Sequence, residues 1–396
     1  MSRPADAADR DGTDRAHMAR ALELAARGLY TTDPNPRVGC VLVRGNETLG
    51  EGWHARAGEA HAEVAALKAA RADVRGATAY VSLEPCSHTG RTPPCADALI
   101  AAGIGRVVCA SVDPNPRVAG AGIERLKAAG IAVAVGILES EARALNPGYF
   151  SRFERGRPYV RLKLAMSLDG RTAPAGGGAV WISGEASRAD VQRWRARSSA
   201  VLTGAGTVRT DDPRLDVRWA YGPWVRQPLR AVLDTTLGCS PGARIFAREG
   251  ALVFASEAAG AAAAARLAAH VPPVAVERVP TRGDRLDLKA VLTRLTGLEV
   301  NELLVECGPR LAAAFLEESL VDEWIIYMAP RLLGADAAPL TALAGLGARS
   351  AGCAFDIMSV ERFDSDLRLV LEPRRAALDS QGTAPGDEGA ERCSRE

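Results

Sequence analysis

The chain has 396 residues, which favours two domains rather than one, and its apolar fraction of 47% is enough for buried cores. A formal net charge of +1 gives no general attraction to nucleic acid or to an anionic membrane, and no stretch approaches the ~20 apolar residues of a membrane span. The eight cysteines are dispersed along the chain, which is not typical of a disulfide framework and fits a reducing cytoplasm.

The first part of the chain is expected to alternate strands and helices after a polar, disordered leader at residues 1–14. An amphipathic helix begins at Arg15 and ends near Gly28. Later elements, in order, are strands at 40–43 and 49–54, a helix at 62–70, a strand at 78–83, a helix at 96–102, a strand at 106–111, a helix at 122–129 and a strand at 131–135. This alternation predicts an α/β domain at residues 15–145, with ligands bound at strand ends and helix starts.

A linker is expected at residues 146–158, because this stretch contains the breakers Asn146-Pro-Gly and Gly156-Arg-Pro. A second α/β domain should follow at residues 159–373, with Ser183 as the N-cap of a helix that runs to Arg197. Its other elements are strands at 159–165, 200–203, 229–234 and 251–255, an Ala-rich helix to about 270, a helix at 286–296, a strand at 301–306, a helix at 310–318 and β segments at 323–328, 353–361 and 366–371. The polar end of the chain, residues 374–396, is expected to be disordered.

Four residues of the first domain form a pattern with a chemical meaning: His61, Glu63, Cys86 and Cys95. One His and two Cys can supply three ligands to a tetrahedral Zn²⁺ and leave the fourth position for water. A His-x-Glu followed by Pro-Cys and a second Cys is the signature of zinc-dependent nucleobase deaminases. Glu63 is then placed to take a proton from the water and to pass it to the ring nitrogen and the leaving amine.

The surroundings of these residues suit the same chemistry. Helix N-termini near the ligands would favour thiolate over thiol, and Zn²⁺ would lower the pKa of its bound water to roughly 7. Two other interpretations remain open at this point. The His and the Cys can be ordinary core residues, or His88 can complete the four protein ligands of a structural zinc site.

The loop between the two cysteines is polar and basic, and it lies beside the expected metal. His88 and Arg91 there would suit a phosphate or a polar ring edge. Asn35 and His54, on earlier loops, are weaker candidates for contact with a substrate.

At these motifs the chain resembles the bifunctional deaminase/reductase family of riboflavin biosynthesis, over residues 15 to about 372. The sequence motifs on which the resemblance rests here are Pro34–Gly39, Ala60–Glu63 and Pro85–Cys95. The two cysteines are separated by eight residues, unlike the two-residue spacing of the cytidine deaminase signature.

The resemblance implies a cytidine-deaminase-like α/β/α fold for the first domain. It implies removal of the 2-amino group of 2,5-diamino-6-(5-phosphoribosylamino)pyrimidin-4(3H)-one. It places the zinc ligands at His61, Cys86 and Cys95, and proton transfer at Glu63.

The second domain gives weaker signals of its own. Strand–Gly–helix junctions at Gly204–Gly206 and Gly308 could bring backbone N–H groups close to a phosphate, although ordinary turns have the same appearance. Arg195 and Arg218 could bind phosphate as planar forks, or they could be surface arginines.

The resemblance says more about the second domain than its residues do alone. It rests there on the sequence motifs Leu162–Gly170, Trp181–Ser183, Gly206–Pro213 and Val305–Leu311. It implies a dihydrofolate-reductase-like α/β fold, NADPH as cofactor and reduction of the ribosyl group to ribityl by hydride transfer. The implied cofactor contacts are Ala165, Trp181, Thr207, Asp211, Gly308, Pro309, Arg310 and Leu311. The implied substrate contacts are Arg195, Leu215, Arg218 and Glu306, with Lys163 as a candidate for polarising the sugar oxygen.

The chain departs from the family at Ala179, where a serine is often found, and at Cys307, where Gly or Ala is common. Alanine has no hydroxyl, so one hydrogen bond to the substrate is in doubt, and its loss could cost ~1 kcal/mol of substrate binding.

Two rival functions compete with this one. The first is a zinc deaminase of another nucleobase or nucleoside with an inactive or binding-only C-terminal domain. The second is a non-enzymatic protein with an inactive deaminase fold, which would be expected to lack Glu63 or a metal ligand. We expect small-molecule phosphoribosylaminopyrimidine substrates, no nucleic-acid or membrane partner and a cytoplasmic location, with a homo-oligomer as an open option.

Overall fold

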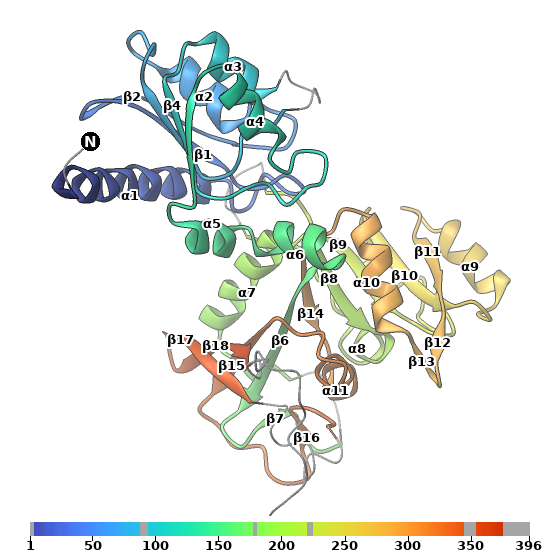
Figure 1. Cartoon of the computed structure of the whole chain (residues 1–396). Helices are drawn as coiled ribbons and strands as arrows, with labels where there is room; N and C mark the ends of the chain where they lie inside the picture. Colours follow the sequence, from blue (N-terminus) through green and yellow to red (C-terminus); the bar gives the residue numbers. More distant parts are fainter. Residues whose placement is uncertain (1–3, 88–93, 177–179, 220–224, 344–353, 375–396) are drawn as a thin grey trace, which may run out of the picture.

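The computed structural model describes residues 4–87, 94–176, 180–219, 225–343 and 354–374. Figure 1 shows two α/β units, each built on its own sheet, with two short helices between them. We call them the five-stranded unit and the nine-stranded unit. None of the helices in the described part of the chain has the length and apolar character needed to cross a bilayer.

The five-stranded unit has the strand order β2-β1-β3-β4-β5. β1 is antiparallel to β2 and β3, whereas β3, β4 and β5 are parallel. The strands are β1 Gly39–Arg44, β2 Glu47–Trp53, β3 Thr78–Val81, β4 Arg106–Cys109 and β5 Ala132–Val135. The helices are α1 Pro4–Ala26, α2 Ala62–Ala69, α3 Cys95–Ala101 and α4 Ala121–Ala128.

Both faces of this sheet are covered, because the side chains of a strand alternate between its two faces. Cys40 and Leu42 of β1 pack in one cluster with buried residues of α2, α3 and α4. Val41 and Val43 point to the other side and pack with Met18 of α1. The result is the three-layered α/β/α arrangement that the sequence predicts.

The nine-stranded unit has the strand order β11-β10-β9-β8-β14-β6-β15-β18-β17. The strands from β11 to β15 are parallel, and β18 and β17 form an antiparallel edge. Its strands are β6 Tyr159–Ser167, β8 Ala200–Gly204, β9 Leu229–Leu233, β10 Ala251–Ser256, β11 Ala275–Val279, β14 Glu302–Glu306, β15 Glu323–Ala329, β17 Phe355–Phe363 and β18 Asp366–Pro373. Short pieces are β7 Arg171–Ala173, β12 Thr281–Arg282, β13 Arg285–Leu286, β16 Ala338–Pro339 and the 3₁₀ turn η1 Arg244–Phe246. Its helices are α7 Glu185–Arg197, α8 Ala205–Asp211, α9 Ala261–Ala268, α10 Leu288–Gly297 and α11 Pro309–Glu317.

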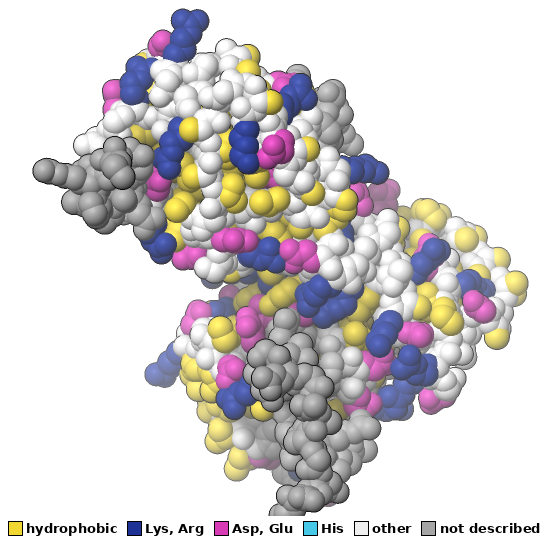
Figure 2. Space-filling view, in the orientation of Figure 1, with side chains coloured by type: hydrophobic (Ala, Val, Ile, Leu, Met, Phe, Trp, Pro, Cys, Tyr) yellow, Lys and Arg dark blue, Asp and Glu magenta, His cyan; other side chains and the backbone are white. Residues whose placement is uncertain are grey.

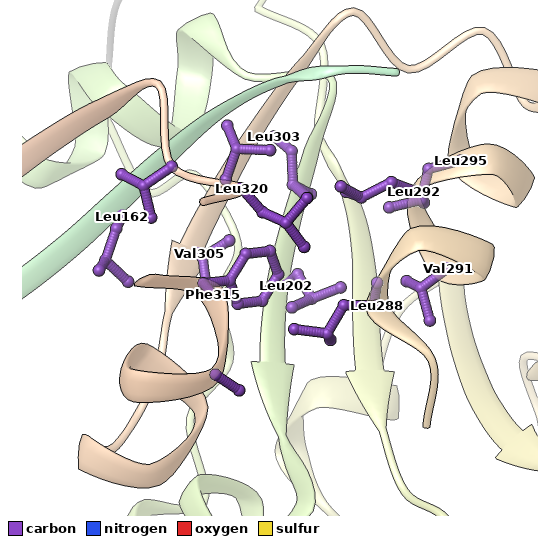
Figure 3. Packing of buried hydrophobic residues seen from close by; sticks show 14 of the residues in the cluster. Leu162, Leu202, Leu288, Val291, Leu292, Leu295, Leu303, Val305, Phe315 and Leu320 are labelled. Carbon is purple, nitrogen blue, oxygen red and sulfur yellow. The ribbon is translucent and has the colours of Figure 1, made fainter. Parts of the chain in front are cut away.

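The parallel strands of this unit are buried on both faces, as expected of a sheet covered by helices. In Figure 3, Leu303 and Val305 of β14 lie near Phe315 of α11 and Leu292 of α10, in one continuous core. The intervening Leu304 belongs to the cluster on the opposite face. This packing fixes the ends of β6, β8 and β14, where the candidate site of this unit lies.

The stretch expected to be a linker, residues 146–158, is helical over most of its length. α5 (Glu139–Leu145) and α6 (Pro147–Arg155) lie between the two units in Figure 1. Pro147 stands at the first position of α6, where a missing N–H costs nothing, so it starts a helix instead of breaking one. Tyr149 and Phe150 are buried, and only Gly156, with φ of 64°, ends the helix as the breaker rule predicts.

Two local expectations differ from the structure. α1 begins at Pro4 and therefore runs through most of the expected leader. The N-cap of α7 is Gly184 rather than Ser183, and it makes no side-chain cap hydrogen bond. The strand–Gly–helix junction expected at Gly204–Gly206 is present, and its helix is the short α8. The expected disordered tail lies outside the described residues except for Arg374.

Two candidate active sites

The first site lies where two helices begin beside the end of a strand. His61 is the N-cap of α2, Cys95 is the first residue of α3, and Cys86 lies in the loop that follows β3. The backbone N–H of Cys95 donates to the Cys86 sulfur over 3.3 Å. The local fold thus brings together three residues that are separated by up to 34 positions in the sequence.

The geometry of these three side chains fits a zinc ion. His61 Nδ1 lies 3.2 Å from Cys95 Sγ and 3.6 Å from Cys86 Sγ. Around a tetrahedral Zn²⁺, with a Zn–S distance of about 2.3 Å and a Zn–N distance of about 2.0 Å, nitrogen and sulfur ligands lie about 3.5 Å apart. Within the described ranges, this is the only group of three or more His, Cys, Asp or Glu residues whose ligand atoms are close enough to hold a metal.

The two thiols are strongly coupled. The hydrogen bond from Cys95 lowers the pKa of Cys86 to about 4, and the contact with His61 adds to this effect. The pKa of Cys95 is correspondingly far above its ordinary value, first because of its bond to Cys86 and then because of burial. Zn²⁺ binds cysteines as thiolates, so the ion would draw the proton off Cys95 as well.

Glu63, in the first turn of α2, is only 3% exposed. Burial raises the pKa of its carboxyl to about 7. A carboxyl with a pKa near neutrality can both accept and donate a proton, which is what a general acid–base residue requires. The motif therefore places a suitable group directly beside the ligand cluster.

Asn35 and His54 also meet at this site. Asn35 Nδ2 lies 3.0 Å from His54 Nε2, and the other ring nitrogen of His54 lies 3.0 Å from the Ala60 carbonyl oxygen. Burial lowers the pKa of His54, which favours the neutral ring with its proton on Nδ1 and Nε2 as acceptor from Asn35. The rings of His54 and His61 are 5.2 Å apart. His88 and Arg91 lie outside the described residues.

Sequence reasoning missed a buried carboxylate that shapes this site. Glu84 accepts hydrogen bonds from four backbone N–H groups, those of Asp113, Gly120, Gly122 and Ile123. Only its partner segment had a signal in the sequence, because Asp-Pro-Asn-Pro-Arg-Val occurs twice, at 33–38 and at 113–118. The second copy begins at Asp113, whose carboxylate accepts a hydrogen bond from the Tyr149 hydroxyl of α6 over 3.1 Å.

The second site is a cleft of about 1400 Å³ at the carboxyl ends of the parallel strands of the nine-stranded unit. This is the edge at which parallel α/β sheets bind ligands. All thirteen residues predicted for this half line the cleft: Lys163, Ala165, Trp181, Arg195, Thr207, Asp211, Leu215, Arg218, Glu306, Gly308, Pro309, Arg310 and Leu311. Ala179 lies outside the described residues.

A buried charged group occupies the floor of the cleft. Arg195 donates to both carboxylate oxygens of Glu306, over 2.6 and 2.9 Å, and Lys163 Nζ lies 4.0 Å from the same carboxylate. Burial alone would raise the pKa of Glu306, but Arg195 outweighs it and holds that pKa below its ordinary value. Burial lowers the pKa of Lys163.

The walls of the cleft fit a dinucleotide. Gly204 is the N-cap of α8 and Gly308 is the N-cap of α11, so unpaired N–H groups of two helix starts face one cleft. A Cβ at Gly308 would lie 3.9 Å from Thr207 Oγ1, which shows how near the two starts are. Trp181 is 72% exposed at the rim, with the Arg188 guanidinium 4.9 Å from its ring centre.

Comparison with known proteins agrees with both sites. The family described as cytidine and deoxycytidylate deaminase zinc-binding region matches residues 11–111, and the RibD C-terminal domain matches residues 158–369. Riboflavin biosynthesis protein RibD of Escherichia coli (strain K12) is 47% identical over 368 residues, which cover 90% of this chain and 99% of the relative. The chain belongs to the RibD family. The RibD of Haemophilus influenzae is 43% identical and spans 91% of this chain and 98% of its own.

Solved structures of the RibD family extend the likeness to the fold. Acinetobacter baumannii RibD matches with a TM-score of 0.85 and 43% identity, over 92% of this chain and 100% of that chain. The Thermotoga maritima protein described as diaminohydroxyphosphoribosylaminopyrimidine deaminase/5-amino-6-(5-phosphoribosylamino)uracil reductase matches with a TM-score of 0.78 and 33% identity, over 92% and 99%. The predicted fold class is therefore confirmed, and Zn²⁺ and NADPH are the cofactors of the RibD family to which the two sites correspond.

Proposed function

We propose that this RibD-family protein catalyses two consecutive steps of riboflavin biosynthesis. The first is hydrolytic deamination of 2,5-diamino-6-(5-phosphoribosylamino)pyrimidin-4(3H)-one. The second is NADPH-dependent reduction of the ribosyl side chain to ribityl. The observation that carries the proposal is that one chain holds a three-ligand cluster beside a buried carboxyl and, separately, a cleft large enough for a dinucleotide and a second ligand.

In the deamination, His61, Cys86 and Cys95 would hold Zn²⁺, which supplies a water that ionises near neutral pH when it is bound. Glu63 takes one proton of the attacking water and delivers it to the ring nitrogen; it then carries the second proton, from the newly formed hydroxyl group, to the departing amine. The bond from C2 to the amino nitrogen breaks, ammonia leaves and a carbonyl remains. Asn35 and His54 contact the pyrimidine ring beside the metal ligands.

In the reduction, the N–H groups at the starts of α8 and α11 would hold the pyrophosphate of NADPH, and the bound cofactor would supply the hydride for C1′. Lys163 donates a proton to the sugar oxygen as the bond between that oxygen and C1′ breaks. Glu306 keeps Lys163 and Arg195 oriented, and Arg218, exposed at the cleft, offers positive charge to the substrate phosphate.

The environment of the protein is part of the proposal. Cysteines in the described ranges are free thiols, which supports a cytoplasmic location. Self-association through the edge strand β17 is supported by exposed Ile357, Met358 and Val360. On the face shown in Figure 2, Lys and Arg alternate with Asp and Glu, which suits small-molecule substrates better than a polyanion.

The experiment that tests the proposal incubates the purified protein with the diaminopyrimidine substrate, with and without NADPH. We expect ammonia release in both cases and NADPH oxidation after deamination. Absence of ammonia would rule out the deaminase step, and deamination without NADPH oxidation would rule out only the reductase step.

Glu63→Gln makes the test residue-specific. We expect it to retain zinc and to lose deamination by at least ~10²-fold, because the general acid–base group is gone. Reduction of the already deaminated compound should be unchanged. Glu23→Gln on α1, at a side chain that is 67% exposed, is the matched control and should keep both activities.

A further inference from the structure

The loop at residues 33–37, which carries Asn35 to the first site, is held from the other unit. The Asp33 carboxylate accepts hydrogen bonds from Ser199 Oγ over 2.8 Å and from Asn301 Nδ2 over 3.0 Å. Asn301 Nδ2 also donates to the Pro34 carbonyl oxygen over 2.8 Å. Ser199 and Asn301 are both buried and belong to the nine-stranded unit.

The other end of the loop is anchored as firmly. The buried guanidinium of Arg37 donates to Glu302 Oε1 over 2.5 Å. The backbone N–H of Arg37 donates to Asn146 Oδ1 over 2.8 Å, and its carbonyl oxygen accepts from Asn146 Nδ2 over 2.9 Å. Asn146 stands at the junction of α5 and α6, the helices between the two units.

Asn35 lies between these anchors. Its side chain reaches His54, whose ring packs against His61. A continuous series of contacts therefore connects Asn301, through Asp33 and Asn35, to a candidate metal ligand.

The loop has little internal support. Pro34 and Pro36 have no N–H to donate. The backbone N–H of Asn35 donates a hydrogen bond to the carbonyl oxygen of Thr32, just before the loop, over 2.9 Å. A segment without a ladder of its own takes the conformation that its side-chain anchors impose. Those anchors come from the nine-stranded unit and from the helices that lead to it.

We propose that the reductase domain positions the substrate loop of the deaminase, with Asn301 and Ser199 as positioning residues for Asn35. The deaminase site is then complete only in the two-domain chain. The part of this inference that concerns substrate rests on the proposed function, because it takes Asn35 to contact the pyrimidine.

The two sites are far enough apart for a selective test. Asn301 immediately precedes β14, and Glu306, in the reductase cleft, ends it. Five residues of extended strand span about 16 Å. A change at Asn301 should therefore leave the reductase cleft intact.

The test uses the full-length zinc protein with Asn301→Ala. We expect deaminase kcat/KM to fall on the order of tenfold, mainly through a higher KM, because a hydrogen bond to the partly buried Asp33 carboxylate is lost. Zinc content and NADPH-dependent reduction of the deaminated compound should match the wild type. Thr296→Ala, which deletes a 3.1 Å hydrogen bond to the Gly156 carbonyl oxygen away from the loop, is the matched control.

A second readout does not depend on substrate. Hydrogen exchange at residues 32–38 should be faster in Asn301→Ala than in the wild type, while exchange in β1 and β3 stays the same. Asp33→Ala should have the same effect, and the double variant should show less than the sum of the two effects, because both changes remove the hydrogen bond between Asp33 and Asn301.

Three outcomes would overturn the proposal: unchanged exchange in the loop, faster exchange with unchanged deamination, or a parallel loss of both activities together with zinc. A wild-type protein that releases no ammonia would refute the deaminase function itself. The exchange measurement would still decide whether the reductase domain holds the loop.

Discussion

Lys163 combines burial with a nearby carboxylate and an aromatic face. Its Nζ lies 4.0 Å from Glu306 and 5.6 Å from the ring centre of Tyr327. Burial lowers the pKa of its ammonium below the ordinary ~10.4, although Glu306 works in the opposite direction. The protonated form is the hydrogen-bond donor, so reduction should weaken as the pH rises through this lowered pKa.

We predict that Lys163→Met lowers the reductase kcat by roughly 10²-fold and removes this alkaline decline, because no titrating donor remains. Steady-state rates of reduction across the alkaline range would check it. Deamination should be unaffected in the same preparation. Lys289→Met, at an exposed lysine of α10, is the control, and an alkaline limb that persists in Lys163→Met would contradict the role.

The candidate zinc ligands and the residues around them differ in how far sequence could reveal them. His61, Glu63, Cys86 and Cys95 are recognisable because each chemical role demands one residue type at a set spacing. Glu84 has no such signature, since its partners are backbone N–H groups 29 to 39 residues away. The role of Glu84 can therefore be recognised only from the fold.

The Glu84 side chain alone binds both the loop at Asp113 and the start of α4. It binds the N–H groups of Gly120 and Gly122 at the beginning of α4, each over 2.9 Å. A Cβ at Gly122 would lie 1.9 Å from the Pro85 carbonyl oxygen, so α4 is pressed against the strand end that leads to Cys86. These contacts hold the start of α4 beside the loop that carries Cys86.

We predict that Glu84→Gln lowers the free energy of unfolding of the deaminase domain by roughly 3 kcal/mol, because the amide NH₂ would face N–H donors. Urea titration would measure the change, and zinc loss to a chelator should be faster. Glu124→Gln on α4, at a side chain that is 72% exposed, is the matched control. Equal stability of the two variants would refute the role of Glu84.

Most helices and strands can be predicted from the periodicity of their apolar residues, but helix boundaries near Pro and Gly cannot. Asn146-Pro-Gly predicts a linker, yet Pro147 fits the first turn of α6, and Tyr149 and Phe150 bury its inner face. The tertiary contacts of α6 thus override the local rule. β17 also gives a weak pattern, because most of its side chains are exposed at the sheet edge.

The junction of the two domains was beyond prediction from sequence. Arg37 and Glu302 are 265 residues apart, and neither belongs to a recognisable motif for the contact. Two further guanidiniums, those of Arg161 and Arg197, bind the same buried carboxylate. Length and composition predict two domains, but only the fold shows that the Glu302 carboxylate binds Arg37 of the five-stranded unit together with two arginines of its own unit.

This cluster should make the stability of the whole chain depend on pH. Burial alone would raise the pKa of Glu302, but Arg197, Arg37 and Arg161 outweigh it and hold that pKa far below its ordinary value. A carboxylate with a lowered folded-state pKa stabilises the protein fully above the unfolded value of about 4.3. The stabilisation is lost as the pH falls toward the folded-state pKa.

We predict that Glu302→Gln lowers the free energy of unfolding by about 3 kcal/mol or more at neutral pH, because three buried guanidiniums lose their shared counter-charge. The difference from wild type should shrink as the pH falls below about 4.3, where the unfolded wild-type carboxyl takes up a proton. Denaturant titrations at several pH values would measure it, with Glu299→Gln, at a side chain that is 67% exposed, as the control. A pH-independent difference would show that the loss comes from packing rather than from the charge of Glu302.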